Sequence, residues 1–190
     1  MTTARRLHHW YADYLRALER SEVKLEFCDG EIYALAGGAP AHAALSAAVV
    51  RELSVALKGR GVVYSSDLKV RVEASDLSTF PDVSVVCGDR KVSAIDENAV
   101  TNPTILVEVT SRSTEDYDRG HKLSHYKQLP SLRAVLLVSH RARRVTLVQR
   151  ASSGWDELEF QAGETVELFE PACAIAVDAV YDGLGLEPGT

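Results

Sequence analysis

The sequence contains little cysteine and lacks any long apolar run. Its three cysteines, Cys28, Cys87 and Cys173, are odd in number, far apart and at no spacing typical of metal ligands. A disulfide framework is therefore not expected, and reduced thiols are typical of a cytoplasmic protein. No stretch approaches the roughly 20 apolar residues of a membrane helix, and the N-terminus lacks a signal-peptide core. We expect a cytoplasmic protein without membrane contact.

The chain also lacks an excess of positive charge. Its 21 lysines and arginines are outnumbered by 27 aspartates and glutamates, which gives a net charge of -6. This balance argues against avid nonspecific binding of nucleic acid, although a local basic patch can outweigh it. A phosphate-binding loop is missing as well, because no Walker lysine follows the glycine-rich segment at 37–40 and no GxGxxG follows a strand.

What is present is the composition of one soluble domain. Of the 190 residues, 46% are hydrophobic and 25% are charged, which is typical of a globular protein with a sizeable core. We expect a single domain over residues 1–190, with a loose tail at 182–190. The alternation of helical and strand patterns predicts an α/β (α+β) fold, in which a central mixed β-sheet is flanked by helices.

The periodicity of apolar residues predicts the individual elements. Alternating apolar residues flank Asp29-Gly30, which is the strongest short-range signal for a hairpin. Lys69 and Arg71 alternate with apolar residues, so we expect both to face solvent or a ligand. The predicted elements are a helix at 5–20, a hairpin at 23–35, a helix at 41–58, extended segments at 62–64 and 68–72, a turn at 78–81, a strand at 82–86, a short helical piece near 92–99, a strand at 105–109, a helix from 113 or 114 to 128, strands at 134–138 and 145–148, further strand and turn at 152–165, and an apolar segment at 173–180.

Two of the predicted strands each carry a carboxylate. Asp82 opens the run Val83–Val86, and Glu108 stands inside the run Ile105–Val109. An unpaired carboxylate among apolar residues is costly. If the strands are neighbours, the two acids repel, and one pKa rises unless a cation lies between them. A hard divalent ion with oxygen ligands suits such a pair, and the alternative of two unrelated strand-end acids stays open.

A charged ladder follows on the next predicted helix. Asp118, Lys122 and Tyr126 stand at i, i+4 and i+8, so they share one helix face. One interpretation is a surface ion pair worth a few tenths of a kcal/mol. The other is that Lys122 leans over the sheet towards Glu108.

Three more side chains are candidates for this site. His42 lies in the first turn of a predicted helix, where it is either an ordinary helix-start histidine or points at the acid pair. Glu26 and Glu31 flank the hairpin turn. For each of these two glutamates we favour a solvated position on a strand face.

Taken together, these motifs resemble those of the Uma-two family of predicted restriction endonucleases, within the PD-(D/E)XK nuclease superfamily. The resemblance covers roughly residues 12–180 and implies a restriction-endonuclease-like core of helix, three strands, helix and strand. The motifs that carry it are Leu25-Glu26-Phe27-Cys28-Asp29-Gly30-Glu31-Ile32, His42 at a helix start, Pro81-Asp82-Val83, Val107-Glu108-Val109-Thr110-Ser111, and the ladder Asp118, Lys122 and Tyr126.

The resemblance implies a catalytic set. Asp82 and Glu108 would bind Mg²⁺, or Mn²⁺, and Lys122 would be the catalytic lysine. The superfamily lysine usually stands two positions after the glutamate, where this chain has Thr110, and Lys122 matches a lysine displaced onto the following helix. Secondary positions that match the family are His42, Glu26 and Glu31.

The chain departs from the family outside this set, and its function therefore has alternatives. Arg112, Leu136 and Ser139 replace a proline, a tryptophan and an aspartate, which affects packing or substrate details more than catalysis. The implied activity is metal-dependent hydrolysis of DNA phosphodiester bonds by a homodimer, as is common for restriction enzymes. The alternatives are an inactive nuclease-fold module that binds or interacts without turnover, and a hydrolase of another phosphodiester.

Overall fold

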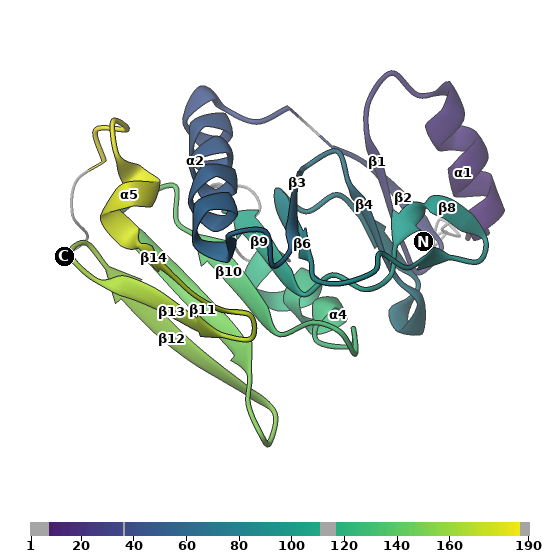
Figure 1. The fold of residues 1–190 in the computed structure, drawn as a ribbon. Coiled ribbons are helices and arrows are strands. Elements are labelled where there is room, and N and C mark those ends of the chain that lie inside the picture. Colours follow the sequence, from purple (N-terminus) through teal and green to yellow (C-terminus); the bar gives the residue numbers. More distant parts are fainter. Residues whose placement is uncertain (1–7, 36, 111–116, 187–190) are drawn as a thin grey trace, which may run out of the picture.

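The fold was analysed in a computed structural model, which describes residues 8–35, 37–110 and 117–186 (Figure 1). It has the expected mixed α+β class, with helices packed on sheets that contain both parallel and antiparallel strand pairs. The elements in chain order are α1 (Tyr11–Arg20), β1 (Leu25–Cys28), β2 (Glu31–Ala34), α2 (Pro40–Leu57), β3 (Val62–Ser65), β4 (Lys69–Val72), η1 (Glu73–Ser75), β5 (Leu77–Thr79), β6 (Val83–Val86), β7 (Val92–Ser93), β8 (Asp96–Val100), β9 (Ile105–Val109), η2 (Asp118–Lys122), α4 (Leu123–Tyr126), β10 (Ala134–Val138), β11 (Arg144–Arg150), β12 (Trp155–Gln161), β13 (Thr165–Phe169), β14 (Ala172–Ala176) and α5 (Val177–Tyr181).

The strands form two six-stranded sheets rather than one central sheet. The first sheet has the order β2-β1-β5-β4-β8-β7, and the second has the order β12-β11-β10-β9-β6-β3. A separate pair, β13 and β14, lies beside the second sheet in Figure 1. The first sheet forms because β4 and β5 pair with the N-terminal hairpin and with β8, instead of extending the second sheet.

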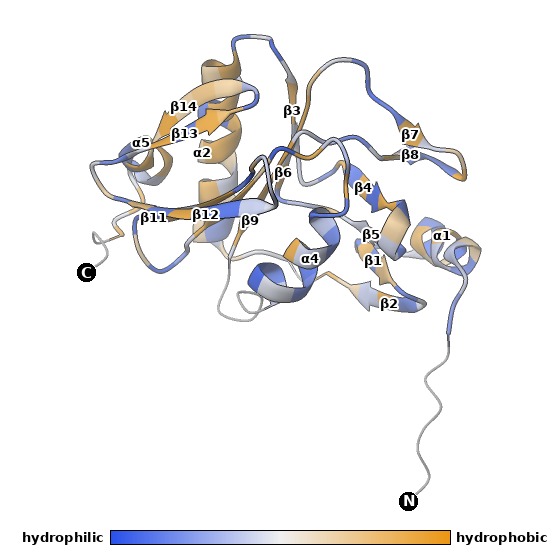
Figure 2. Cartoon of the chain, turned by 90° about the horizontal axis from the view of Figure 1, so that it is seen from below, coloured by the Kyte–Doolittle hydropathy of each residue, from blue (hydrophilic) through white to orange (hydrophobic). Residues whose placement is uncertain are grey.

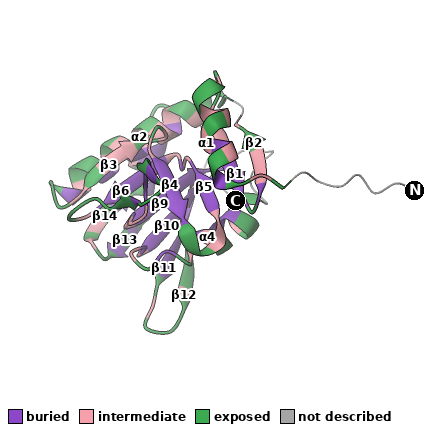
Figure 3. Ribbon diagram, turned by 90° about the vertical axis from the view of Figure 1, so that its right-hand side faces the viewer, coloured by how far each residue is buried: buried purple, intermediate pink, exposed green. Residues whose placement is uncertain are grey.

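The second sheet carries apolar side chains on both faces, so its central strands are buried (Figure 3). On one face lies α2, whose predicted stripe of Leu45, Val49, Leu53 and Leu57 is fully buried. On the other face, Leu106 packs with residues of α4. Because side chains alternate along a strand, Glu108 lies on the same face as Leu106, which is the face that α4 covers.

The N-terminal hairpin forms as predicted. Asp29 and Gly30 both have positive φ angles, 45° and 82°, as a tight hairpin turn requires. Phe27 faces α1 and packs with Tyr11 and Tyr14. Alternation along β1 therefore turns the residues on either side of Phe27 towards the opposite face, where η2 and α4 lie.

Two segments, one on each side of the predicted Asp82 strand, differ from expectation. The turn predicted at 78–81 begins inside a strand, because Ser78 and Thr79 belong to β5. The helical piece predicted near 92–99 is wrong, since this segment contains β7 and β8. Ala99 of β8 pairs with Lys69 of β4 in a parallel ladder. The sequence of β8 itself does not indicate this distant partner, because its residues are mixed in hydropathy (Figure 2).

Lys69 and Arg71 do not face solvent, which corrects the expectation for that strand. Lys69 is 5% exposed, and its Nζ lies 2.7 Å from Oδ2 of Asp96. The guanidinium carbon of Arg71 lies 3.9 Å from the ring centroid of Tyr11, and its NH2 group pairs with Asp76. Both charges are buried against partners from other elements, which strand alternation alone does not reveal.

The helix boundaries also differ from the predicted ones. The first helix begins at Tyr11 rather than at residue 5, and residues 5–7 lie outside the described part of the chain. The predicted start at 113 or 114 lies outside it too. The described part of this helix includes the π-helix Asp118–Lys122 and continues as α4 to Tyr126.

The C-terminal segment packs partly against the core of the second sheet through Leu184 and Leu186. Residues 187–190 of the predicted tail lie outside the described part. Within the described ranges, no helix has the length and apolar content needed to cross a membrane.

Candidate active site

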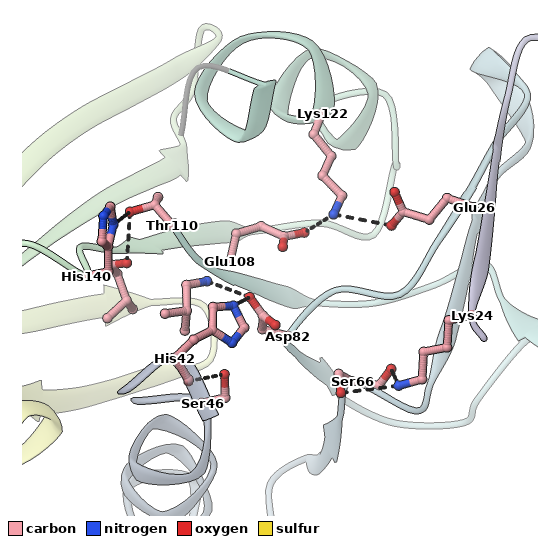
Figure 4. A network of polar contacts seen from close by, with 12 residues as sticks. Lys24, Glu26, His42, Ser46, Ser66, Asp82, Glu108, Thr110, Lys122 and His140 are labelled. Atoms are coloured by element: carbon pink, nitrogen blue, oxygen red, sulfur yellow. Dashed lines mark hydrogen bonds and ion pairs between the residues drawn. The ribbon is translucent and has the colours of Figure 1, made fainter. Parts of the chain in front are cut away.

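The two predicted acids lie beside each other on the second sheet, Glu108 inside β9 and Asp82 directly before β6. β6 runs antiparallel to β9, with Val83 paired to Val107, so the next step of the register places Asp82 opposite Glu108. Figure 4 shows both carboxylates at this point of the sheet. Glu108 is 4% exposed, so the pair lies at the edge of the core.

Asp82 is held by two donors. The backbone N–H of Val109 donates to its Oδ2 at 2.7 Å, and Nε2 of His42 lies 3.2 Å from the same oxygen. His42 belongs to the first turn of α2, and it points at the acid, as one of its two interpretations proposed (Figure 4). The hydrogen bond to Asp82 raises the pKa of His42 against the opposing effect of burial, which favours an imidazolium beside the carboxylate.

Glu108 is held by Lys122 and Tyr126. The Nζ of Lys122 lies 3.1 Å from Oε1 of Glu108, and the Tyr126 hydroxyl donates to the same oxygen at 2.5 Å. Burial raises the pKa of Glu108 to about 8, with Asp82 and Asp118 adding to the rise and Lys122 opposing it. Burial disfavours the charge of Lys122, yet the surrounding carboxylates, Glu108 first, raise its pKa above the ordinary value.

The ladder is therefore not a surface ion pair, and the expectation of a few tenths of a kcal/mol does not apply. Asp118 is 4% exposed, Lys122 is 5% exposed and Tyr126 is 1% exposed. The alternative interpretation, in which Lys122 leans towards Glu108, matches the observed contact.

Glu26 joins the same network, so the solvated position favoured for it is wrong. It is 4% exposed, and its Oε1 lies 3.4 Å from Nζ of Lys122. The same oxygen accepts hydrogen bonds from the Thr79 hydroxyl and, at 3.2 Å, from the backbone N–H of Phe80. Lys122 thus lies between carboxylates of β1 and β9, and so connects the two large sheets (Figure 4).

Glu31 has a different position. It lies on β2, opposite Cys28 in the hairpin register, and is half-buried. Its Oε2 accepts a hydrogen bond from the Tyr33 hydroxyl.

The charge balance of this region suits a cation. Among the described residues, four carboxylates gather around one lysine and one histidine, and Asp82 and Asp118 both act on Glu108. In the part of the chain that the structure describes, the contacts of the central pair use Oδ2 of Asp82 and Oε1 of Glu108, so within this part the second oxygen of each acid is available to a metal ion. Oxygen donors at the edge of a sheet are the ligands that Mg²⁺ prefers, so these residues fit a divalent ion. The four acids are Glu26, Asp82, Glu108 and Asp118.

Sequence reasoning missed Thr79, whose hydroxyl orients Glu26. No local signal could have identified it, because the two residues are distant in the sequence and meet only through the pairing of β1 with β5. Thr110, at the usual lysine position, is fully buried and lies 3.4 Å from Nδ1 of His140 through its hydroxyl. Its side chain therefore faces away from the lysine network (Figure 4).

Known proteins resemble this chain over most of its length. It is 38% identical over 176 residues to the uncharacterized protein slr1290 of Synechocystis sp., covering 90% of both chains. It is 30% identical over 158 residues to the uncharacterized protein sll1609 of the same organism, covering 83% of this chain and 89% of that one. Neither name states an activity.

A solved structure shares the fold. The crystal structure described as a "putative nuclease belonging to DUF820" from Anabaena variabilis superposes with a TM-score of 0.72 at 16% identity, over 89% of this chain and 96% of that one. This likeness shows the restriction-endonuclease-like architecture. The Uma2 family, described as "Putative restriction endonuclease", matches residues 11–178. With its sequence relatives and its fold in agreement, the chain belongs to the Uma2 family of restriction-endonuclease-like proteins.

Proposed function

We propose that the protein is a nuclease that uses a divalent metal ion, Mg²⁺ or Mn²⁺, to hydrolyse phosphodiester bonds of DNA. The observation that carries this proposal is the position of Asp82 opposite Glu108, with Nζ of Lys122 3.1 Å from the Glu108 carboxylate. Membership of a nuclease family supports a hydrolytic role and the general use of a divalent metal.

Each residue of the set has a chemical task in this proposal. Asp82 and Glu108 would hold the metal ion, which when bound polarises the phosphate and lowers the pKa of a bound water. Lys122 supplies a fixed positive charge that stabilises the negative charge developing on the phosphate. Its position is set by Glu26 and Glu108. His42 orients Asp82 through its hydrogen bond.

The test is Mg²⁺-dependent cleavage by purified wild type and Asp82→Asn on duplex DNA, single-stranded DNA and RNA. Asp82→Asn removes one charge with little change in shape, and Asp156→Asn on the exposed strand β12 is the matched control. We expect wild type and Asp156→Asn to cut duplex DNA and Asp82→Asn to be inactive. Equal cutting by Asp82→Asn would refute the assigned mechanism.

The same panel separates the alternatives. If the wild type binds DNA without cutting it, the protein is a noncatalytic module. If it cuts only RNA, it is a hydrolase whose substrate is a phosphodiester other than DNA. The proposal also includes a homodimer, because two sites are needed to cut both strands in one encounter, and sedimentation analysis of wild type would measure it.

A further inference from the structure

A second cluster of ligand-type side chains lies beside the Lys122 network. Sγ of Cys28 and one ring nitrogen from each of His121 and His125 all lie within 4.8 Å of one another. Cys28 comes from β1, and the two histidines stand four residues apart on the η2–α4 helix. None of these residues takes part in the contacts of Asp82, Glu108 or Lys122 described above.

The distances suit a tetrahedral ion with sulfur and nitrogen ligands. Sγ of Cys28 lies 3.8 Å from Nε2 of His125. In a zinc site, bond lengths of about 2.3 Å to sulfur and 2.0–2.1 Å to nitrogen separate such ligand atoms by about 3.6 Å. The Cys28 and His125 atoms therefore need almost no movement. His121 is exposed and stacks on Tyr117, so its ring can close the remaining gap by turning at the protein surface.

The surroundings of the cluster also favour a cation. Four carboxylates act electrostatically on Cys28, with Asp29 the strongest; the others are Asp76, Glu26 and Glu31. Cys28 is 6% exposed, whereas His121 is open to solvent and offers a path for entry.

We propose that Cys28, His121 and His125 form a second metal site, distinct from the acid pair, that binds Zn²⁺. The donor set of one thiolate and two imidazoles selects zinc over the hard ions that carboxylates prefer. The fourth position belongs to water, as in zinc sites with three protein ligands.

The position of this site gives it a structural role. Cys28 follows Glu26 by two residues on β1, and His121 directly precedes Lys122 on η2. A bound Zn²⁺ joins β1 to the helix at the same place where Glu26 meets Lys122. It therefore fixes the helix that carries Lys122 against the first sheet. This inference rests on the Cys and His geometry and does not depend on the proposed nuclease activity.

The competing explanation is that the cluster is only a weak contact between a thiol and an imidazole. The ring centroid of His121 lies 5.5 Å from that of Tyr117, on which it stacks, and 4.6 Å from that of His125. Packing between these rings would by itself explain why the two histidines lie close together. The two explanations differ in whether the cluster binds a metal ion with a thiolate ligand.

Co²⁺ is the probe, because it occupies tetrahedral zinc sites and gives a thiolate charge-transfer band that carboxylate sites cannot give. Reduced wild-type protein would be titrated with Co²⁺ in an absorption spectrometer, and Zn²⁺ would then be added to displace it. The variants are Cys28→Ser and His121→Ala, and the controls are Cys173→Ser and Asp82→Asn.

We expect the thiolate band of the wild type to saturate at about one Co²⁺ per chain, because the acid pair can bind Co²⁺ but cannot give this band. The band should be lost in Cys28→Ser, and the affinity should fall roughly a hundredfold in His121→Ala. Both controls should keep the thiolate band of the wild type, because neither changes a residue of the Cys28, His121 and His125 cluster. No band in the wild type, a band that survives in Cys28→Ser, or unchanged affinity in His121→Ala would each overturn the proposal. Since His121 is exposed, its variant decides the question if Cys28→Ser does not fold, as checked by circular dichroism.

Discussion

Lys122 is the residue on which the local structure depends most. It is a buried charge that neutralises two buried carboxylates from different sheets, Glu26 and Glu108. Buried ion pairs stabilise little relative to apolar packing, but removing one partner leaves the others uncompensated. Lys122 therefore stabilises the fold in addition to its proposed catalytic role. A Lys122 variant would lose activity both because the fold is less stable and because the catalytic charge is missing.

Replacing Lys122 with methionine keeps the length of the side chain and removes its charge. We expect Lys122→Met to lower the free energy of unfolding by roughly 3–5 kcal/mol, because Glu26 and Glu108 then share a buried region without a cation. Urea denaturation of the variant against wild type measures this. Lys91→Met, on an exposed residue, is the control and should change the stability by less than about 0.5 kcal/mol.

The double variant Lys122→Met/Glu108→Gln separates charge from packing. Because Glu108→Gln removes the carboxylate that Lys122 neutralises, the double variant should be more stable than the sum of the single changes by roughly 1–3 kcal/mol. Additive losses would contradict a charge coupling between Lys122 and Glu108.

His42 predicts a pH dependence with a definite sign. Its pKa is raised in the folded protein by the hydrogen bond to Asp82, so its protonated form stabilises the fold. That contribution is complete below the ordinary histidine pKa of about 6.5 and is lost as the pH rises through the higher folded value. Glu108, with a pKa raised to about 8, adds a loss in the same direction.

The measurement is the free energy of unfolding of wild type and His42→Gln across neutral pH. We expect the wild type to lose more stability than His42→Gln as the pH rises from 6.5, because the Glu108 contribution is common to both. His8→Gln, on an exposed residue, is the control and should keep the wild-type slope. Parallel curves for wild type and His42→Gln would contradict the assigned role of His42.

At the scale of elements, the hairpin turn aligns β1 so that Glu26 and Cys28 face the helix. Gly30 has a φ of +82°, and an added Cβ would lie 2.0 Å from Nδ1 of His8. We expect Gly30→Ala to destabilise the protein by about 1 kcal/mol or more, because a side chain strains this backbone conformation even if His8 moves aside. Gly37→Ala is the matched control, since nothing lies within 4 Å of its added Cβ. Equal denaturation midpoints for the two variants would contradict this.

The elements that sequence could predict are those with local signals. The Asp29-Gly30 turn, the leucine and valine stripe of α2 and the two acid-bearing strands are visible in residue spacing, and all lie where expected. The ladder of Asp118, Lys122 and Tyr126 was visible too, although its burial was not.

What could not be predicted depends on partners far apart in the sequence. The alternation of its strand predicts that Lys69 faces solvent or a ligand, and only the parallel pairing of β4 with β8 brings Asp96 to it. Glu26 was expected in solvent because nothing near it indicates that Lys122 or Thr79 approaches. By contrast, the spacing of His121 and His125 on one helix face is a typical metal-binding pattern, and it could have indicated the second cluster.

At the scale of the whole molecule, the candidate active site forms where the two large sheets meet. The second sheet contributes Asp82 and Glu108, the first contributes Glu26, and the η2–α4 helix contributes Lys122 between them. A site assembled from both sheets keeps its geometry only if the two sheets stay in a fixed position and orientation relative to each other. The η2–α4 helix holds the two sheets together, because it makes apolar contacts with both and carries two of the proposed zinc ligands.

The most direct test of this account is calorimetric titration of Mg²⁺ or Mn²⁺ into wild type, Asp82→Asn and Glu108→Gln, with a DNA duplex present to complete the metal shell. Asp156→Asn is the control for removal of an exposed charge. The account predicts binding to wild type and control that is absent from both site variants, and that strengthens as the pH rises towards the raised pKa of Glu108. Binding to Asp82→Asn and Glu108→Gln as tight as to wild type would contradict it.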